Sequence, residues 1–155
     1  ENAVRKMKNQ PLREHRHVQV ELPVSAWFPG SWVPPGRHKI ETYRKLSSCQ
    51  TPSELNDLRG ELEDRFGPIP PEAARLLDLK ELQIAAGQWQ INEIRLEDGF
   101  VVFGYLDGLR VRRLQNQLGK RLRIVDRKSA YYVAQAEIGD GEGLLSELKA
   151  VLQSN

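Results

Sequence analysis

Apolar side chains recur three and four positions apart through the middle of the chain, the spacing of helices that bury one face. This spacing predicts three helices, over residues 37–47, 51–66 and 71–87. Their apolar positions are Ile40, Tyr43 and Leu46, then Leu55, Leu58, Leu62 and Phe66, then Ala73, Leu76, Leu77 and Ile84. Because the loops between them are short, the helices should form a small antiparallel cluster.

The second of these helices has the clearest start signal in the chain. Thr51 can act as its N-cap, Pro52 fits the first helical position, and Glu54 can close a capping box. Gly67 and Pro68 then end the helix.

After residue 87 the apolar pattern changes to the alternation that is typical of strands. It predicts four strands, over residues 91–96, 100–106, 121–125 and 130–136. Asp98 and Gly99 favour a tight hairpin turn between the first two. Two further helices are expected, over residues 108–118 after a cap at Asp107 and over residues 142–152. The predicted fold class is α+β: a helical cluster followed by a small, mainly antiparallel sheet with two further helices.

The first 36 residues follow neither pattern. We expect the end of a lead-in helix over residues 1–7, a short strand over residues 17–22, and then a strap rich in proline and aromatic residues. The four prolines of the strap forbid a helix or a central strand there. We therefore divide the chain into a lead-in, 1–36, and a compact α+β regulatory domain, 37–155, which together should form one domain.

Composition excludes several classes of protein. The chain has 155 residues and a net charge of +2, which argues against a basic arm or an acidic tail. A single cysteine, Cys49, excludes a disulfide framework and a cysteine-rich zinc module. Since no apolar run reaches the length of a membrane span, we expect a cytoplasmic protein that has no membrane partner.

The sequence also lacks a convincing catalytic motif. It has no phosphate-binding loop that ends in Gly-Lys-Ser/Thr, and its three histidines lack the spacing of a metal site. Gly139, Gly141 and Gly143 precede a helix, but Asp140 and Glu142 lie between them and would repel phosphate. We therefore expect no catalytic residue, no metal ion and no cofactor in this chain, and no enzymatic activity.

An acidic stripe follows one side of the helix over residues 51–66. At about 100° per residue, four carboxylates fall within roughly 80° of one another, beside the apolar face. They are Glu54, Asp57, Glu61 and Asp64. Arg65 borders the stripe and can pair with Glu61 at i,i+4. The stripe can be a docking face for a basic protein surface, or it can be an ordinary solvated helix face.

A basic cluster lies further along the chain. Across residues 110–128 the only acidic residue is Asp126, and Tyr131 and Tyr132 follow closely as possible stacking platforms. The candidate contacts to nucleic acid are Arg110, Arg112, Arg113, Arg121 and Arg123. The alternative is that lysine and arginine on an exposed strand edge only block aggregation.

The run ELEDRFGPIP at residues 61–70 is a specific signature, and it lies within a longer similar stretch, 38–82. On these residues the chain resembles the carboxy-terminal domain of the bacterial transcription-repair coupling factor, Mfd. The matching positions are Tyr43, Arg44, Leu46, Glu61, Leu62, Asp64, Arg65, Phe66, Gly67, Pro68 and Pro70.

The resemblance implies a regulatory role in transcription-coupled nucleotide excision repair, part of the DNA damage response. Proteins of this family are ATP-driven DNA translocases that remove stalled RNA polymerase and recruit UvrA, with ATP and Mg bound in other domains. Their last domain covers the UvrA-binding surface of a UvrB-like module and restrains the motor. The resemblance gives the contacts to that module to Glu61, Asp64 and Arg65.

Two rival functions stay open at this point. The first is a nucleic-acid-binding accessory domain that uses the basic cluster, 110–128. The second is a purely structural cap on the motor, in which neither charged cluster matters.

Overall fold

The structure is a computed structural model, and it describes residues 18–153. The helix end expected over residues 1–7 lies outside the described residues. The three helices expected in the middle of the chain are present, as α1 (Arg37–Ser48), α2 (Pro52–Phe66) and α3 (Pro71–Gln88). Two further helices follow, α4 (Gly108–Leu118) and α5 (Gly141–Gln153), with a short 3-10 turn, η1 (Gly119–Arg121), after α4.

The capping box predicted for α2 is confirmed. The Thr51 hydroxyl oxygen accepts a hydrogen bond from the Glu54 backbone N–H at 3.1 Å, and the Glu54 carboxylate accepts one from the Thr51 backbone N–H at 3.2 Å. Two backbone donors that the helix itself leaves unpaired are thereby satisfied. The start of the helix that carries the acidic stripe is therefore fixed.

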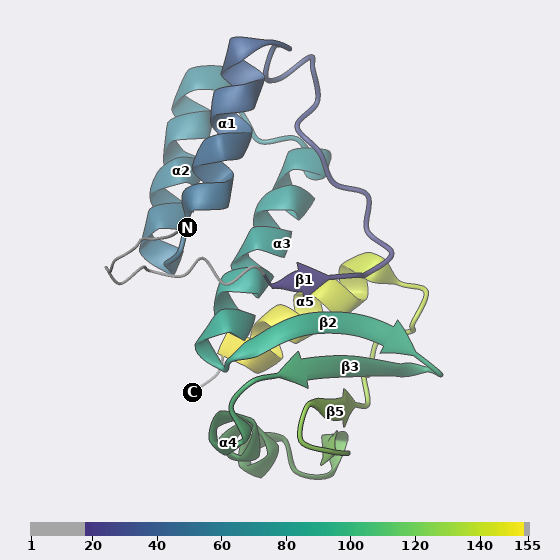
Figure 1. The fold of residues 1–155 in the computed structure, drawn as a ribbon. Helices are drawn as coiled ribbons and strands as arrows, with labels where there is room; N and C mark the ends of the chain where they lie inside the picture. The colour runs from purple at the N-terminus through teal and green to yellow at the C-terminus, as the bar shows by residue number, and fades with distance from the viewer. Residues whose placement is uncertain (1–17, 154–155) are drawn as a thin grey trace, which may run out of the picture.

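Five strands form one sheet in the order β1-β2-β3-β5-β4 (Figure 1). They are β1 (Gln19–Val20), β2 (Ile91–Glu97), β3 (Phe100–Tyr105), β4 (Leu122–Ile124) and β5 (Ser129–Tyr132). β1 runs parallel to β2, and the other three pairs are antiparallel, so the predicted α+β class is confirmed. The turn between β2 and β3 has positive φ at both Asp98 (52°) and Gly99 (82°), as the tight hairpin requires.

The last strand is shorter than the sequence suggests: it ends at Tyr132 and not at residue 136. Beyond it, the backbone N–H groups of Gln135 and Ala136 donate to the Glu147 carboxylate of α5, at 2.8–3.0 Å. These amides are bonded to a side chain, so they do not continue a strand ladder.

The expected apolar face of α1 needs a correction. Ile40 is 60% exposed, and the buried residues of the helix are Thr42 and Leu46. Burial of Thr42 is tolerated because its hydroxyl donates to the His38 carbonyl oxygen at 2.7 Å. Tyr43 is half exposed, and its ring packs against Phe28 with centroids 4.7 Å apart.

Two hydrophobic cores hold the fold together. The sheet core combines the inward residues of the strands with α4, α5 and the end of α3. The helical core combines α1, α2 and one side of α3, from Ala73 to Ile84, with Phe28 and Val33 of the strap, both fully buried. Trp32 also fixes the strap, since its indole N–H donates to the Gly67 carbonyl oxygen at 3.2 Å. Within residues 18–153, no helix is both long and apolar enough to cross a membrane.

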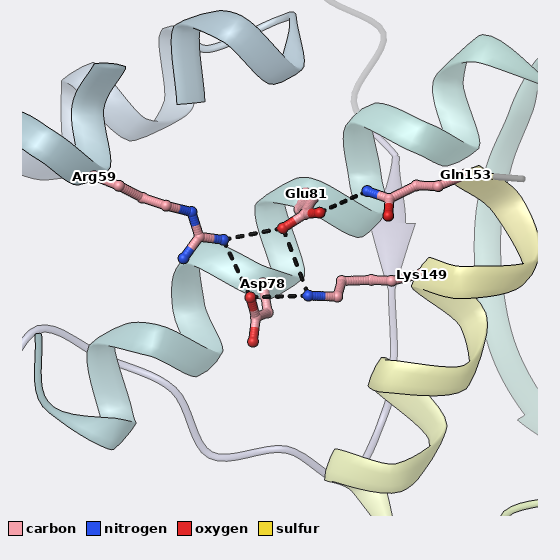
Figure 2. A network of polar contacts seen from close by, with 5 residues as sticks. All are labelled: Arg59, Asp78, Glu81, Lys149 and Gln153. Atoms are coloured by element: carbon pink, nitrogen blue, oxygen red, sulfur yellow. Dashed lines mark hydrogen bonds and ion pairs between the residues drawn. The ribbon is translucent and has the colours of Figure 1, made fainter. Parts of the chain in front are cut away.

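A polar network joins the two cores (Figure 2). Arg59 of α2 contacts Asp78 at 3.1 Å and Glu81 at 3.0 Å, both on α3. Lys149 of α5 reaches the same two carboxylates at 3.0 and 3.5 Å, and Gln153 donates to Glu81 at 2.6 Å. Two cations from different helices thus share two carboxylates, which fixes α2 and α5 against α3.

Candidate functional site

The acidic stripe lies on a solvent-facing side of α2, next to α1. Leu55, Leu58 and Leu62 of the same helix are buried in the helical core. This burial fixes the rotation of α2 about its axis, so the stripe faces outward. Its four carboxylates do not have equivalent surroundings.

Glu61 lies between two cations. Its carboxylate is 2.5 Å from the Lys45 Nζ of α1 and 3.6 Å from an Arg65 guanidinium nitrogen. The hydrogen bond from Lys45 lowers the pKa of Glu61, and the charges of Lys45 and Arg65 add to this effect against slight burial. Glu61 is therefore ionised at neutral pH, and part of its charge is already compensated.

The Glu54 carboxylate caps the start of α2. It accepts hydrogen bonds from the backbone N–H groups of Gln50 at 2.7 Å and of Thr51 at 3.2 Å. The sequence indicated two roles for this residue, in the cap and in the stripe. The structure places its carboxylate in the cap.

Asp57 and Asp64 are the exposed acids of the stripe. In the part of the chain that the structure describes, neither carboxylate has a hydrogen-bond or ion-pair partner. A basic surface that buries such a carboxylate can supply the cation that compensates for its loss of water. These two side chains are the ones most available to a basic partner.

Arg65 borders the stripe as predicted and has several contacts. Its guanidinium lies 5.0 Å from the centre of the Phe66 ring, and one of its nitrogens is 3.3 Å from the His38 Nδ1 of α1. Together with the pair to Glu61, these contacts limit the positions of the guanidinium. Arg65 is exposed and can still turn one edge of its guanidinium toward a partner.

A shallow groove of about 430 Å³ runs between α1 and α2. Arg44, Lys45 and Ser48 line it from α1, and Asp57 and Glu61 line it from α2. The candidate docking face is therefore an acidic ridge beside a groove of mixed charge. This arrangement of charges favours one orientation of a partner that has complementary charges.

The structure divides the basic cluster. Arg121 bonds the Tyr132 hydroxyl and the Glu147 carboxylate of α5, the latter at 2.9 Å, and lies 5.1 Å from the centre of the Tyr132 ring. Arg110 donates to the Gln88 carbonyl oxygen and lies 3.9 Å from Asp107. Both arginines have a role in the fold. The other candidates, Arg112 and Arg113 on α4 and Arg123 on β4, are exposed.

Sequence reasoning missed Glu147, which lies far from the basic cluster along the chain. Burial alone would raise the pKa of Glu147, but hydrogen bonds from Tyr132, Gln135 and Ala136 and the charge of Arg121 outweigh it, and its pKa is lowered. Burial and the contact with Glu147 raise the pKa of Tyr132. The only local signal was an acidic residue on the helix expected over residues 142–152, and an acidic residue on a helix is ordinarily assigned to the solvated surface.

Neither a metal site nor a reactive thiol emerges from the described residues. Among residues 18–153, no three histidine, cysteine, aspartate or glutamate side chains converge on a point that could hold a metal ion. Cys49 is buried in the helical core, and this burial raises the pKa of its thiol, which leaves it in the unreactive protonated form.

Comparisons with known proteins agree with the signature on α2. A transcription-repair coupling factor of Myxococcus xanthus is 31% identical over 160 residues, which is 99% of this chain and 13% of the relative. One from Staphylococcus aureus is 38% identical over 77 residues, which is 50% of this chain and 7% of the relative. The chain thus spans only a small part of the relatives that it matches.

The fold has a counterpart among solved structures. The crystal structure of a C-terminal domain of transcription-repair coupling factor superposes with a TM-score of 0.69 at 19% identity, and the match covers 88% of this chain and 89% of that one. At this identity the match shows a shared fold. A model of the TRCF domain family matches residues 22–116. The resemblance carried by residues 61–70 is therefore confirmed, and the chain belongs to the TRCF domain family.

Proposed function

We propose that this domain is a non-catalytic, autoinhibitory domain of a transcription-repair coupling factor. In this role it masks the UvrA-binding surface of a UvrB-like module of the same protein and restrains the DNA translocase until the protein engages stalled RNA polymerase. The observation that carries the proposal is a pair of exposed carboxylates, Asp57 and Asp64, which have no partner within residues 18–153 and lie beside the ionised Glu61 on a firmly capped helix.

The surroundings of the stripe favour a reversible contact. Exposed ion pairs each contribute about 0.2–1 kcal/mol, and partly desolvated ones contribute more. A tether within one protein raises the effective concentration of the partner surface to roughly mM, so a weak interface is enough to stay closed. Such a contact opens when another partner binds the open state better.

The parent protein would act in nucleotide excision repair in the bacterial cytoplasm and would bind RNA polymerase, DNA and UvrA. ATP and Mg would bind in its motor domains. This domain would supply the restraint and no chemistry.

Calorimetric titration of the chain with the separately expressed UvrB-like module, at low salt, tests the proposal. Asp64→Lys should weaken binding by about 10-fold or more, equivalent to about 1.4 kcal/mol, because it reverses the charge of an exposed contact acid. Asp57→Lys should act in the same direction. These variants are cleaner than Glu61→Lys, which also breaks the ion pair with Lys45.

Glu63→Lys is the matched control. Glu63 is an exposed acid on the same helix, next to Asp64 in sequence, and lies about 100° away around the helix. It should leave the affinity within about 2-fold. If Glu63→Lys and Asp64→Lys weaken binding equally, only the net charge of the chain matters and the stripe is not the contact face. If the wild-type chain does not bind near mM concentration, masking through α2 is wrong.

A further inference from the structure

Among residues 18–153, the helices that pack on the sheet, α3, α4 and α5, all share a core with one of its faces and leave the other without a helix. Residues of one parity along the strands, among them Ile94, Phe103 and Tyr132, lie in the sheet core with α3, α4 and α5. Residues of the other parity point the opposite way. The strand register aligns four of these residues in a row across β2, β3, β5 and β4: Arg95, Val102, Tyr131 and Arg123, of which only Val102 is buried.

This open face carries an aromatic pair. Phe100 and Tyr131, on neighbouring strands, have ring centroids 5.4 Å apart and ring planes inclined at 36°. Both rings are half-buried, so part of their surface faces solvent. Val125 and Val133 beside them are 49% and 50% exposed, an unusual exposure for large apolar side chains at one spot.

These residues line a hollow of about 470 Å³ together with two cations, Lys120 and Arg123. None of the residues that line it is acidic. Among residues 18–153, no carboxylate forms an ion pair with Lys120 or Arg123. The same two cations also line a second hollow, of about 540 Å³, which continues toward Gln115 and Asn116 of α4.

Charges on the open face are distributed unevenly. On β2, Arg95 is paired with Glu93 at 3.6 Å and also contacts Glu97, so that side of the face carries two carboxylates. The β4 side carries the unpaired Lys120 and Arg123. An anion that reaches the aromatic pair is therefore directed toward β4 and away from β2.

We propose that this hollow binds single-stranded nucleic acid, with a base packed on Phe100 and Tyr131 and a neighbouring phosphate held by Lys120 and Arg123. Aromatic platforms flanked by cations are the combination by which single strands are bound. A duplex cannot offer an unstacked base to the platform. The inference goes beyond the proposed function, because none of the residues that line the hollow lies on α2.

Fluorescence anisotropy with labelled oligonucleotides of about 12 nucleotides, at about 50 mM salt, tests the charge requirement. Lys120→Glu/Arg123→Glu should weaken binding of oligothymidine by about 10-fold or more. The matched control is Arg112→Glu/Arg113→Glu, an equal charge change on α4 outside the hollow, which should weaken it by less than about 3-fold. Equal losses in the two variants would overturn the proposal, because binding would then follow net charge alone.

A second pair of variants tests the aromatic platform. Tyr131→Leu should weaken binding by about 5- to 150-fold, which corresponds to 1–3 kcal/mol per stacked base. Tyr131→Phe keeps the ring and should stay within about 2-fold of the wild-type chain. Circular dichroism shows whether each variant is folded, and a folded Tyr131→Leu chain that binds as tightly as wild type overturns the platform.

Different oligonucleotides complete the test. Oligothymidine and oligouridine should both bind, and the tighter of the two identifies DNA or RNA as the natural source of the strand. A duplex of equal length should bind at least about 5-fold more weakly. Equal affinity for duplex and single strand, or binding to none of the three, overturns the proposal. If an acidic peptide binds and the oligonucleotides do not, and if Lys120→Glu/Arg123→Glu abolishes that binding, the proposal is overturned and the face is assigned to a protein partner.

Discussion

The helical half of the molecule and its sheet half differ in how they are built and in the charge they present. The helical half comprises residues 28–33 of the strap, α1, α2 and one side of α3, and its core forms mostly between consecutive helices. The sheet half comprises β1 to β5, α4, α5 and the end of α3, and β1 pairs with β2 across three intervening helices. The exposed stripe of the first is acidic, and on the β4 side of the second two cations, Lys120 and Arg123, have no ion-pair partner within residues 18–153.

This difference supports the two proposals, in which the two surfaces bind different partners. An acidic ridge on a capped helix suits a basic protein surface, whereas an aromatic hollow flanked by cations suits a flexible anion with flat rings. α3 belongs to both cores, and the network around Arg59 links the helices on either side of it (Figure 2). The two halves should therefore unfold as one unit. The two proposed binding surfaces, the stripe on α2 and the hollow on the sheet, are nevertheless separate.

The largest expected effect comes from a cavity in either core. Leu62 in the helical core is 1% exposed, and Leu148 in the sheet core is fully buried. Leu62→Ala and Leu148→Ala should each lower the free energy of unfolding by about 2–5 kcal/mol. Urea unfolding followed by circular dichroism and by tryptophan fluorescence measures both variants.

The shape of these transitions tests the shared helix. If α3 couples the cores, the two probes should give one coincident transition in both variants. Two separate transitions, with only the mutated half destabilised, would show that the halves fold independently.

A smaller, pH-dependent effect is expected in the sheet half. Glu147→Gln should cost about 1–3 kcal/mol at pH 7, because it removes a charge that accepts hydrogen bonds from Tyr132, Gln135 and Ala136. Because folding lowers the pKa of Glu147, its contribution is present above the pKa of about 4.3 in the unfolded chain and is lost as the pH falls through the lower folded value. Stability curves at several pH values should show the two proteins converging in acid. A difference that stays constant with pH would contradict this role.

The smallest expected effect concerns the polar network that links the two halves. Arg59→Met should destabilise the chain by about 1–2 kcal/mol, since it removes a cation that two partly buried carboxylates share with Lys149. A double-mutant cycle with Lys149→Met should give a coupling energy of about 0.5–1 kcal/mol. Strict additivity would mean that the network does not transmit stability between α2 and α5.

The sequence predicted best what short-range chemistry determines. Thr51 and Glu54 form the cap of α2 because both residues lie within one helical turn, and Asp98-Gly99 forms the hairpin because the turn needs positive φ at both positions. The α+β class and the order of elements followed from the same local signals. The acidic stripe was also visible, because the periodicity of one helix determines it.

Features that depend on distant partners could not be predicted. The pairing of β1 with β2 and the burial of Thr42 in place of Ile40 both follow from how the strap lies against the helices and the sheet. From the sequence alone, Arg121 is assigned to the solvated surface. In the fold, α5 places Glu147 beside it and the two form an ion pair. The hollow on the open face joins β3, β4 and β5, so no single stretch of sequence contains it.

Hydrogen–deuterium exchange of the chain, with and without the UvrB-like module, tests most directly that the acidic stripe on α2 is the surface that docks. We expect slower exchange in α1 and α2, across residues 37–66, with β2 to β5 unchanged, and clearly less protection in the Asp64→Lys variant at the same concentration of the module, chosen near the wild-type Kd. Protection centred on the sheet, or protection of α2 that Asp64→Lys leaves undiminished at that concentration, would contradict docking through the stripe.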